Sequence, residues 1–246
     1  IKPWVKVSSS PIGKYRDTNR YPSRGWNAYH VVYQDAQRWL KEGIHDALFP
    51  MMYFQGNNFY PFALDWKEND GKRWIIPGLG IYFLSPREQD WPLDEIVRQI
   101  HFTRQIKLNG QAYFRNRFLL DNTKGVLDEL EENFYTYPAL IPPMTWSDSI
   151  PPSVPSHPSV QQIANGKLRM SWQASADNSN QSVVYHLYGS DTYPVDIKQP
   201  QNLIATHLIA NEYEYTAKLP WLQKRYFAVT AADRFGNESA PLTLNT

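Results

Sequence analysis

Four apolar runs, each followed by a helix-like segment, dominate the first 150 residues of this 246-residue chain. The runs begin near positions 3, 45, 74 and 111. Strands that alternate with helices in this way are parallel and are joined by right-handed crossovers. The long, aromatic loops after each run favour a (β/α)8-type barrel over a doubly wound sheet, because barrel enzymes build their sites in those loops. Four strand–helix units are half of such a barrel.

Local patterns place the elements of this region. The stretch from Lys2 to Ser10 is expected to be a buried strand that ends in a loop. Apolar residues at the i, i+3, i+4, i+7 spacing predict a helix that begins at Pro92 and stops at Gly110. Three further helices are expected, one that stops at Gly43 and two at 63–69 and 126–130. The fourth apolar run, QAYFRNRFLL, is expected to be a strand throughout.

A proline-rich seam, SDSIPPSVPSHP at 147–158, ends this pattern, since it suits neither a helix nor a central strand. Beyond the seam the apolar period becomes 2. Short alternating strands over about 95 residues predict a β-sandwich. The expected domains are therefore 1–150 and 151–246. The alternating runs are KLRMSWQAS, VVYHLYGSD, EYEYTAKL, RYFAVTAAD and PLTL.

Composition excludes several classes of partner and site. A formal charge of +1 argues against nucleic acid as a partner. The absence of cysteine excludes disulfides and thiol chemistry. The 6 histidines show no metal-ligand spacing, so no metal is expected. No phosphate loop, dinucleotide loop or nucleophile elbow is present, so no cofactor is expected either.

The last domain resembles a fibronectin type III module. Trp172, Tyr185 and Tyr188 carry this resemblance, together with the run YFAVTAADRFGNES at 226–239, which matches the penultimate strand of the module and the turn after it. Such modules act as spacers or supports in secreted bacterial glycosidases. The positions expected to pack inward are Trp172, Tyr226 and Val229.

The first 150 residues resemble the second half of the bacterial glycoside-hydrolase-like barrel family that includes the YddW-type lipoproteins. Five segments match in order: KPWVKVSSSPIGKYR, YQDAQRWLKEGIHDALFPMMYF, IIPGLGIYF, residues 92–116 and PALIPPMTW. They correspond to the fifth strand, the fifth helix with the sixth strand, the seventh strand, the seventh helix with the eighth strand, and the closing segment. The resemblance implies barrel strands five to eight.

The same resemblance implies a function for a longer parent protein. The acids suspected of catalysis in this family lie at the end of the fourth strand, in a segment that this chain lacks. The parent is expected to be a glycoside hydrolase that acts on peptidoglycan-type glycan or a related polysaccharide, and this chain alone is expected to be inactive. The implied location is the cell envelope or the extracellular space, as a periplasmic protein or outer-membrane lipoprotein. A half barrel exposes two sheet edges, so pairing with the missing N-terminal half or with a second copy is expected.

Candidate site residues lie where the predicted strands end. Tyrosine offers a sugar an apolar face and a hydroxyl, and glutamine or asparagine offers both a donor and an acceptor. Glu88 is the catalytic candidate, because many barrel glycosidases carry a second carboxylate after the seventh strand. Asp90 is expected to cap the following helix, and Arg87 and Arg115 could bind an acidic sugar. The expected substrate-binding residues are Ser9, Ser10, Tyr53, Gln55, Tyr82 and Asn116.

Two other interpretations remain open. A carbohydrate-binding or scaffold protein with a degenerate barrel would bind glycan without forming product. A free-standing α/β domain would cover both edges of its own sheet. In either case Tyr53 and Tyr82 could simply fill the top layer of side chains.

Overall fold

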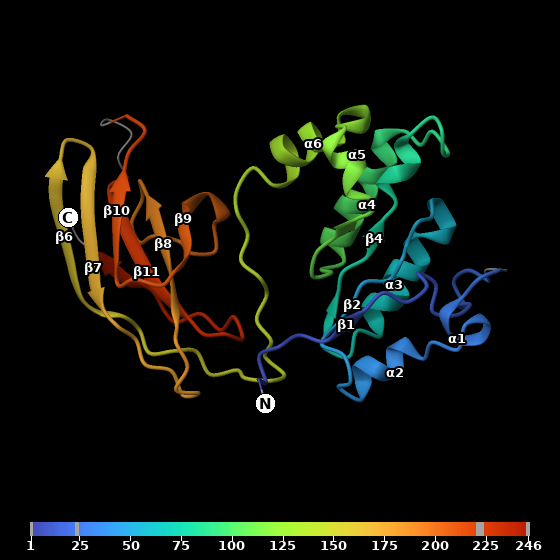
Figure 1. The fold of residues 1–246 in the computed structure, drawn as a ribbon, viewed down its shortest axis with the longest axis horizontal. Coiled ribbons are helices and arrows are strands. Elements are labelled where there is room, and N and C mark those ends of the chain that lie inside the picture. Colours follow the sequence, from blue (N-terminus) through green and yellow to red (C-terminus); the bar gives the residue numbers. More distant parts are fainter. Residues whose placement is uncertain (1, 23–24, 220–223, 245–246) are drawn as a thin grey trace. The chain divides into compact units, whose positions relative to one another are not determined.

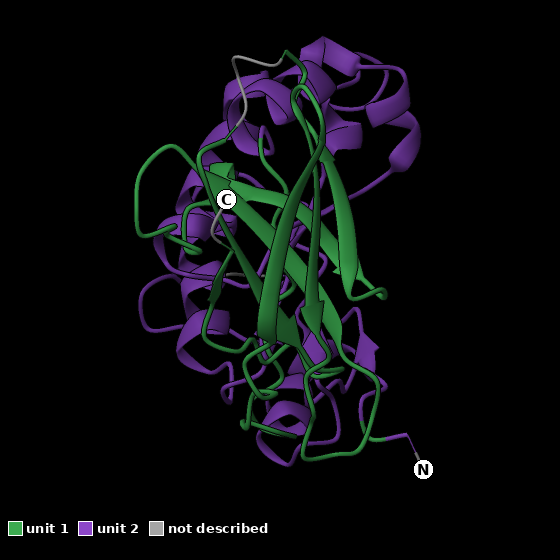
Figure 2. Ribbon diagram, turned by 90° about the vertical axis from the view of Figure 1, so that its left-hand side faces the viewer, with its two compact units in different colours: residues 1, 3, 137–246 green, residues 2, 4–136 purple. Residues whose placement is uncertain are grey.

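A computed structural model describes residues 2–22, 25–219 and 224–244. The chain forms two compact units, which Figure 2 distinguishes by colour. The strand–helix unit contains residues 4–136 with Lys2, and the sandwich unit contains residues 137–246 with Ile1 and Pro3. The boundary expected at 150 differs from this division because residues 137–149 pack with the sandwich. There the Met144 backbone N–H donates to the Phe235 carbonyl at 2.7 Å.

The strand–helix unit alternates short strands with helices (Figure 1). Its strands are β1 (Ser8–Ser9), β2 (Ala47–Leu48), β3 (Trp74–Ile75), β4 (Gly78–Leu79) and β5 (Ala112–Tyr113). Its α-helices are α1 (Ala28–Val31), α2 (Ala36–Lys41), α3 (Tyr60–Glu68), α4 (Leu93–Gln105), α5 (Asn116–Leu120) and α6 (Val126–Glu129). Its described residues also form the 3-10 helices η1 (Gly56–Asn58), η2 (Ile81–Leu84) and η3 (Thr123–Gly125) and the π-helix η4 (Leu130–Phe134).

All pairing between these strands is parallel, as the alternation predicts. β2 lies between β1 and β3, and β4 pairs with β5. Met51 joins the two sheets, because it bridges to Ile12 on one side and to Gly78 on the other. The four apolar runs therefore lie in chain order, and the loops that follow them leave from the same end of the strands.

All four expected strands are shorter in the structure than the apolar runs that predicted them. The second is a strand only at 47–48, and the third only at 74–75 and 78–79, with residues 81–84 in η2. The first begins only at Ser8, and the side chains of Val5 and Val7 are 54% and 50% exposed, so the predicted buried strand over Lys2–Val7 is wrong. The backbone meets its neighbour only from Val7 onward, where the Val7 carbonyl accepts from the Asp46 N–H at 2.8 Å. The fourth run is a strand only at 112–113, and its second half folds into α5.

The helices agree better with their sequence pattern. α2 ends at Lys41, ahead of Gly43 with φ +73°. α4 follows Pro92 as predicted but stops at Gln105, well before Gly110, and the chain turns at Lys107 with φ +58°. Among the described residues, no helix is long and apolar enough to cross a membrane.

Helices α2, α3 and α4 contribute large, fully buried side chains to the core of this unit. Leu40, Phe62, Trp66 and Ile100 are at most 1% exposed. Trp66 also fixes the loop after β1, since its indole N–H donates to the Gly13 carbonyl at 2.6 Å.

The sandwich unit contains seven described strands in two antiparallel sheets. One sheet has the order β10-β7-β6 and the other β12-β11-β8-β9. The expected β-sandwich is confirmed, and Pro158 lies in β6 at a sheet edge, where a missing N–H is tolerated. The strands are β6 (Ser156–Ala164), β7 (Lys167–Gln173), β8 (Val184–Ser190), β9 (Leu203–Leu208), β10 (Glu212–Thr216), β11 (Tyr226–Ala232) and β12 (Leu242–Leu244), with a short turn η5 (Pro200–Asn202) after β8.

The core of the sandwich draws on both sheets. Trp172 of β7 packs at 5.3 Å between ring centroids against Tyr185 of β8, and Val229 of β11 is fully buried. Two of the three predicted core residues are therefore correct. Tyr226 is not, because it is 37% exposed at the start of β11 and its neighbour Phe227 is the buried residue.

Candidate functional site

Three aromatic rings meet where successive strand segments end. Tyr53 follows the second segment, Tyr82 lies in η2 after β4, and Phe114 follows β5. The rings of Tyr53 and Phe114 stack at 5.3 Å between centroids, and Tyr82 meets each of them edge-on at 5.7 Å. We call these three residues the aromatic cluster.

Backbone hydrogen bonds hold the cluster in place. The Tyr82 N–H donates to the Phe114 carbonyl at 3.1 Å, and the Phe114 N–H donates to the Leu79 carbonyl at 3.0 Å. Two glycines make room for Tyr53. A Cβ on Gly78 or Gly80 would lie 3.2 Å from Tyr53 side-chain atoms, closer than ordinary van der Waals contact.

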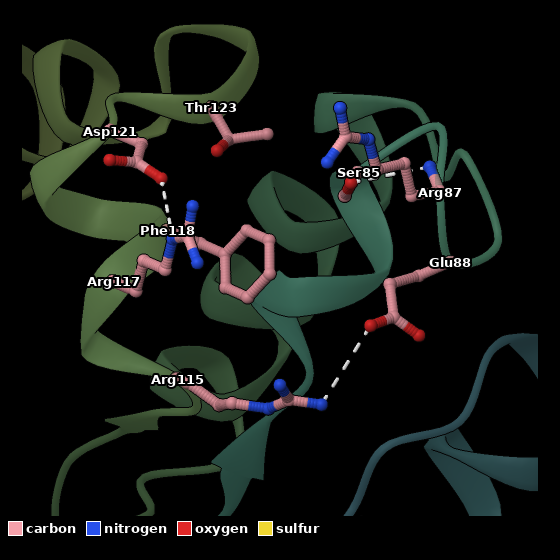
Figure 3. Close-up of a pocket in the computed structure, with 8 residues that line it drawn as sticks. All are labelled: Ser85, Arg87, Glu88, Arg115, Arg117, Phe118, Asp121 and Thr123. Carbon is pink, nitrogen blue, oxygen red and sulfur yellow. Dashed lines mark hydrogen bonds and ion pairs between the residues drawn. The ribbon is translucent and has the colours of Figure 1, made fainter.

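Beside the cluster, the loop after η2 and the segment formed by α5 and η3 line an open pocket of about 450 Å³ (Figure 3). Arg115 connects the two features, since its guanidinium lies 5.1 Å above the Tyr82 ring and 3.7 Å from Glu88 Oε1. Three arginines line the pocket, and we call it the arginine pocket. Its lining residues are Ser85, Arg87, Glu88, Arg115, Arg117, Phe118, Asp121 and Thr123.

Burial keeps the two tyrosines of this site in their neutral form. Burial, followed by the negative charge of Glu88, raises the pKa of Tyr82. Burial also raises the pKa of Tyr53. Both phenols therefore stay protonated at neutral pH and present a hydroxyl that can donate to a sugar oxygen.

The structure brings together only some of the residues that the sequence singled out. Tyr53 and Tyr82 are in direct ring contact, and Glu88 lies next to them through Arg115. Ser10, Gln55 and Asn116 are exposed and line neither the aromatic cluster nor the arginine pocket. Ser9 also lies apart from both, and its buried hydroxyl has no hydrogen-bond partner among the described residues.

Asp90 has a different role from the one expected. α4 begins after Pro92, and no side chain caps it. The Asp90 carboxylate instead accepts from Lys124 Nζ at 2.6 Å, and Lys124 also donates to the Trp91 carbonyl. The predicted helix cap is therefore wrong, and this ion pair ties the loop after β4 to η3.

Lys14 is a buried cation that the sequence analysis missed. It is only 6% exposed and donates to Asn58 Oδ1 at 2.7 Å. Its ammonium lies 4.9 Å and 5.2 Å from the ring centres of Phe54 and Phe62, and burial lowers its pKa. A lysine just after Gly13 gives no sequence signal, because its burial depends on α3 and on the loop after β2.

A second, more open cavity of about 390 Å³ follows β1. Tyr29, His30, Tyr33 and Asp35 line it. Asp35 accepts from the Tyr15 hydroxyl at 2.6 Å, so one wall of this cavity is fixed to the buried core.

Comparison with known proteins finds relatives named as glycosyl hydrolases. No protein-family model matches the chain. Glycosyl hydrolase YngK of Bacillus subtilis (strain 168) is 30% identical over 254 residues, covering 97% of this chain and 49% of the relative. Glycosyl hydrolase DigH of Escherichia coli (strain K12) is 27% identical over 143 residues, covering 48% of this chain and 31% of the relative.

These relatives support a glycoside-hydrolase-like family. Both relatives are named as glycosyl hydrolases, which agrees with the expected reaction class. The chain spans about half the length of the Bacillus relative and about a third of the Escherichia relative.

Solved structures add no independent argument. Chitinase ChiA74 from Bacillus thuringiensis aligns over 98% of this chain and 51% of its own, at 10% identity and a TM-score of 0.34. The FN5 domain of Drosophila Lar aligns over 39% of this chain and 96% of its own, at 15% identity and a TM-score of 0.24. Both scores are below 0.5, so the sandwich is assigned from its own strand pairing.

Proposed function

We propose that this chain is part of a glycoside hydrolase that acts on a cell-envelope glycan, either peptidoglycan-type glycan or a related polysaccharide. The aromatic cluster carries the proposal. Three rings at the ends of successive parallel segments, beside a polar pocket, suit a sugar ring, which has apolar faces and a hydroxylated edge. The likeness to two glycosyl hydrolases, YngK and DigH, supports the reaction class.

The proposed architecture is the C-terminal half of a (β/α)8-type barrel, with the four runs as strands five to eight. Parallel pairing in chain order supports it. The other half is proposed to come from the region of the relatives that this chain does not span, or from a second copy of the chain. The proposed location is the cell envelope or the extracellular space.

Glycoside hydrolysis needs two carboxyl groups, about 5–5.5 Å apart in retaining enzymes and farther apart in inverting ones. Glu88 is the proposed contribution of this chain. Arg115 lies 3.7 Å from Glu88 and over the Tyr82 ring, and so holds Glu88 beside the aromatic cluster. The family resemblance puts the suspected catalytic acids at the end of the fourth strand, ahead of the segments in this chain. We therefore place the general acid in the part of the relatives outside this chain, and we expect this chain alone to be inactive.

A second function is favoured by a specific observation. Both carboxylates of the arginine pocket, Glu88 and Asp121, already face an arginine. A pocket with paired charges suits binding without hydrolysis. A carbohydrate-binding or scaffold role is therefore the second candidate.

The test uses a longer protein that includes the preceding region, incubated with purified, peptide-free glycan strands. New reducing ends and product masses are measured. We expect hydrolysis, lost when acidic residues of the preceding region are neutralised, and reduced about tenfold in kcat/KM by Tyr53→Ala, equivalent to about 1.4 kcal/mol. Tyr193→Ala, at an exposed sandwich position, is the matched control.

Each result has a clear meaning. Glycan binding without product would support the scaffold role. Equal rates for Tyr53→Ala and the parent would separate the aromatic cluster from the substrate. Full hydrolytic activity after the acidic residues of the preceding region are neutralised would contradict the proposed mechanism.

A further inference from the structure

The arginine pocket carries an uneven set of charges. Three guanidinium groups and two carboxylates line it, which gives the lining a net charge of +1. Each carboxylate has its own arginine: Glu88 lies 3.7 Å from Arg115, and Asp121 lies 3.1 Å from Arg117. One positive charge remains.

That charge belongs to Arg87. Among the described residues, its guanidinium has no ion-pair partner. The Arg87 backbone N–H donates to Ser85 Oγ at 3.3 Å, which restrains the loop that carries the side chain. In the view of Figure 3, Glu88 reaches toward Arg115, whereas the Arg87 side chain extends toward the end of the pocket near Ser85 and Thr123.

The rest of the lining matches a ring-sized polar ligand. Phe118 supplies an apolar surface, and Thr123 and Ser85 supply hydroxyl groups. A volume of about 450 Å³ exceeds what a single small anion needs and accommodates a monosaccharide unit. The arginine pocket therefore combines a surface for a sugar ring with a cation at one end.

We propose that the arginine pocket binds a sugar that carries a carboxylate, with Arg87 as its anion-binding residue. This inference deepens the proposed function and rests on it, because it assigns an acidic sugar to a subsite of the same glycan. The guanidinium fork matches the two oxygens of a carboxylate in a bidentate geometry.

Charge balance favours a carboxylate over a phosphate. A single negative charge neutralises the net +1 of the lining. A phosphate near its dianionic form would leave an excess negative charge beside Glu88 and Asp121, whose carboxylates already line the pocket. Inorganic phosphate is therefore expected to compete poorly.

The test measures binding of sugar pairs to the 246-residue chain by NMR titration. Glucuronic acid is compared with glucose, and N-acetylmuramic acid with N-acetylglucosamine, so that the two arms distinguish a carboxylate on the ring from one on an ether side chain. We expect at least one acid to bind about tenfold more tightly than its neutral partner. Arg87→Gln should remove that preference, so that acid and neutral sugars bind equally, and Arg87→Lys should restore part of it.

The matched control is Arg38→Gln, which removes one exposed positive charge on α2, outside the pocket. It should change neither affinity. Four results would overturn the proposal. Acid and neutral sugars could bind equally, or no probe could bind at all. Arg38→Gln could lose as much of the acid preference as Arg87→Gln, or inorganic phosphate could bind as tightly as the acidic sugars.

Failure of this subsite and failure of the proposed function are distinguishable. Hydrolysis of glycan by the longer protein at an unchanged rate in Arg87→Gln, without any acid preference, would leave the hydrolase standing and remove the subsite. A preference for acidic sugars in a longer protein that forms no product would support the subsite and remove the hydrolase.

Discussion

The strands of the sandwich unit and those of the strand–helix unit are held in place by different kinds of contact. In the sandwich, β8 and β11 pair through seven consecutive residues in one register. In the strand–helix unit each strand is two residues long, and single contacts such as that between Trp66 and Gly13 align the segments. The first arrangement is repetitive and spread along whole strands. The second leaves the ends of the strands to long loops, and the aromatic cluster and the arginine pocket are built there.

The largest expected effect tests whether the sandwich core is self-contained. Trp172→Ala removes a side chain that is 4% exposed and should cost about 3–5 kcal/mol. Hydrogen exchange measured by mass spectrometry should show loss of protection in β6–β12 and unchanged protection in β1–α6.

Trp172→Phe is the matched control. It keeps an aromatic contact with Tyr185 and removes an indole N–H that has no partner among the described residues. It should cost less than about 1.5 kcal/mol. Equal loss of protection in both units after Trp172→Ala would contradict separate cores.

The next effect tests the dependence of the strand–helix unit on single contacts. A Cβ on Gly13 would lie 2.4 Å from the Met51 carbonyl oxygen, which is backbone and cannot rotate away. Gly13→Ala should therefore destabilise this unit by about 3 kcal/mol, measured by the same exchange experiment.

Gly56→Ala separates steric overlap from backbone strain. Gly56 has φ +52° with nothing within 4 Å of an added Cβ, so the cost should be only about 1 kcal/mol. A similar cost at both positions would show that the close approach at Gly13 does not matter.

A smaller effect compares one buried tyrosine from each unit. Tyr188 donates to Glu238 at 2.6 Å in the sandwich, and Tyr15 donates to Asp35 at 2.6 Å in the strand–helix unit. Burial, reinforced by these carboxylates, raises the pKa of both phenols. Above about pH 10 the unfolded tyrosine releases its proton first, so this stability is complete below that pH and is lost as the pH rises.

Tyr188→Phe should cost about 1 kcal/mol at neutral pH and should weaken the alkaline loss in the sandwich alone. Tyr15→Phe should do the same in the other unit. Thermal unfolding followed by limited proteolysis, at about pH 8 and about pH 11, measures each unit separately. An alkaline loss that neither variant changes would assign it to other groups.

The smallest effect lies on the surface of the sandwich. Hydrogen bonds from Lys167 and Arg169 lower the pKa of Glu214 to about 2. Its stabilising contribution is present above the unfolded value of about 4.3 and is lost as the pH falls toward about 2. Glu214→Gln should flatten the acid dependence of the thermal midpoint slightly, because exposed ion pairs contribute little. Glu212→Gln on the same strand is the control, and an equal change there would contradict a specific role for Glu214.

Regular patterns predicted much of the fold. The apolar runs after the seam identified β7, β8, β10, β11 and β12. In β7 and β10 the covered and exposed residues alternate, whereas β8 and β11 are buried along almost their whole length. Neither β6, which begins inside the proline-rich seam, nor β9, whose alternation is weaker, was predicted from the sequence. Tyr226 was misassigned because a shift of one residue along a strand exchanges the buried and the exposed face. That shift decides whether Tyr226 or the adjacent Phe227 is buried.

The site was less predictable than the fold. Tyr53 and Tyr82 follow strands closely, so their position at the strand ends could be read from the chain. The predicted roles of Ser9, Ser10, Gln55, Asn116 and Glu88 stay predictions. Phe114 and Phe118 completed the two site features without any sequence signal, since the fourth run looked like one continuous strand.

The sequence by itself determined the order of elements, the change from strand–helix units to a sandwich, and the set of aromatic and charged residues at the strand ends. These follow from local spacing, which needs no knowledge of distant neighbours. Only the tertiary structure decided that Tyr53, Tyr82 and Phe114 share one cluster, and that Arg115 faces Glu88 while Arg87 faces no carboxylate among the described residues. Pairing of charges depends on separations of a few ångströms between loops far apart in the chain, and that distance is a property of the folded molecule alone.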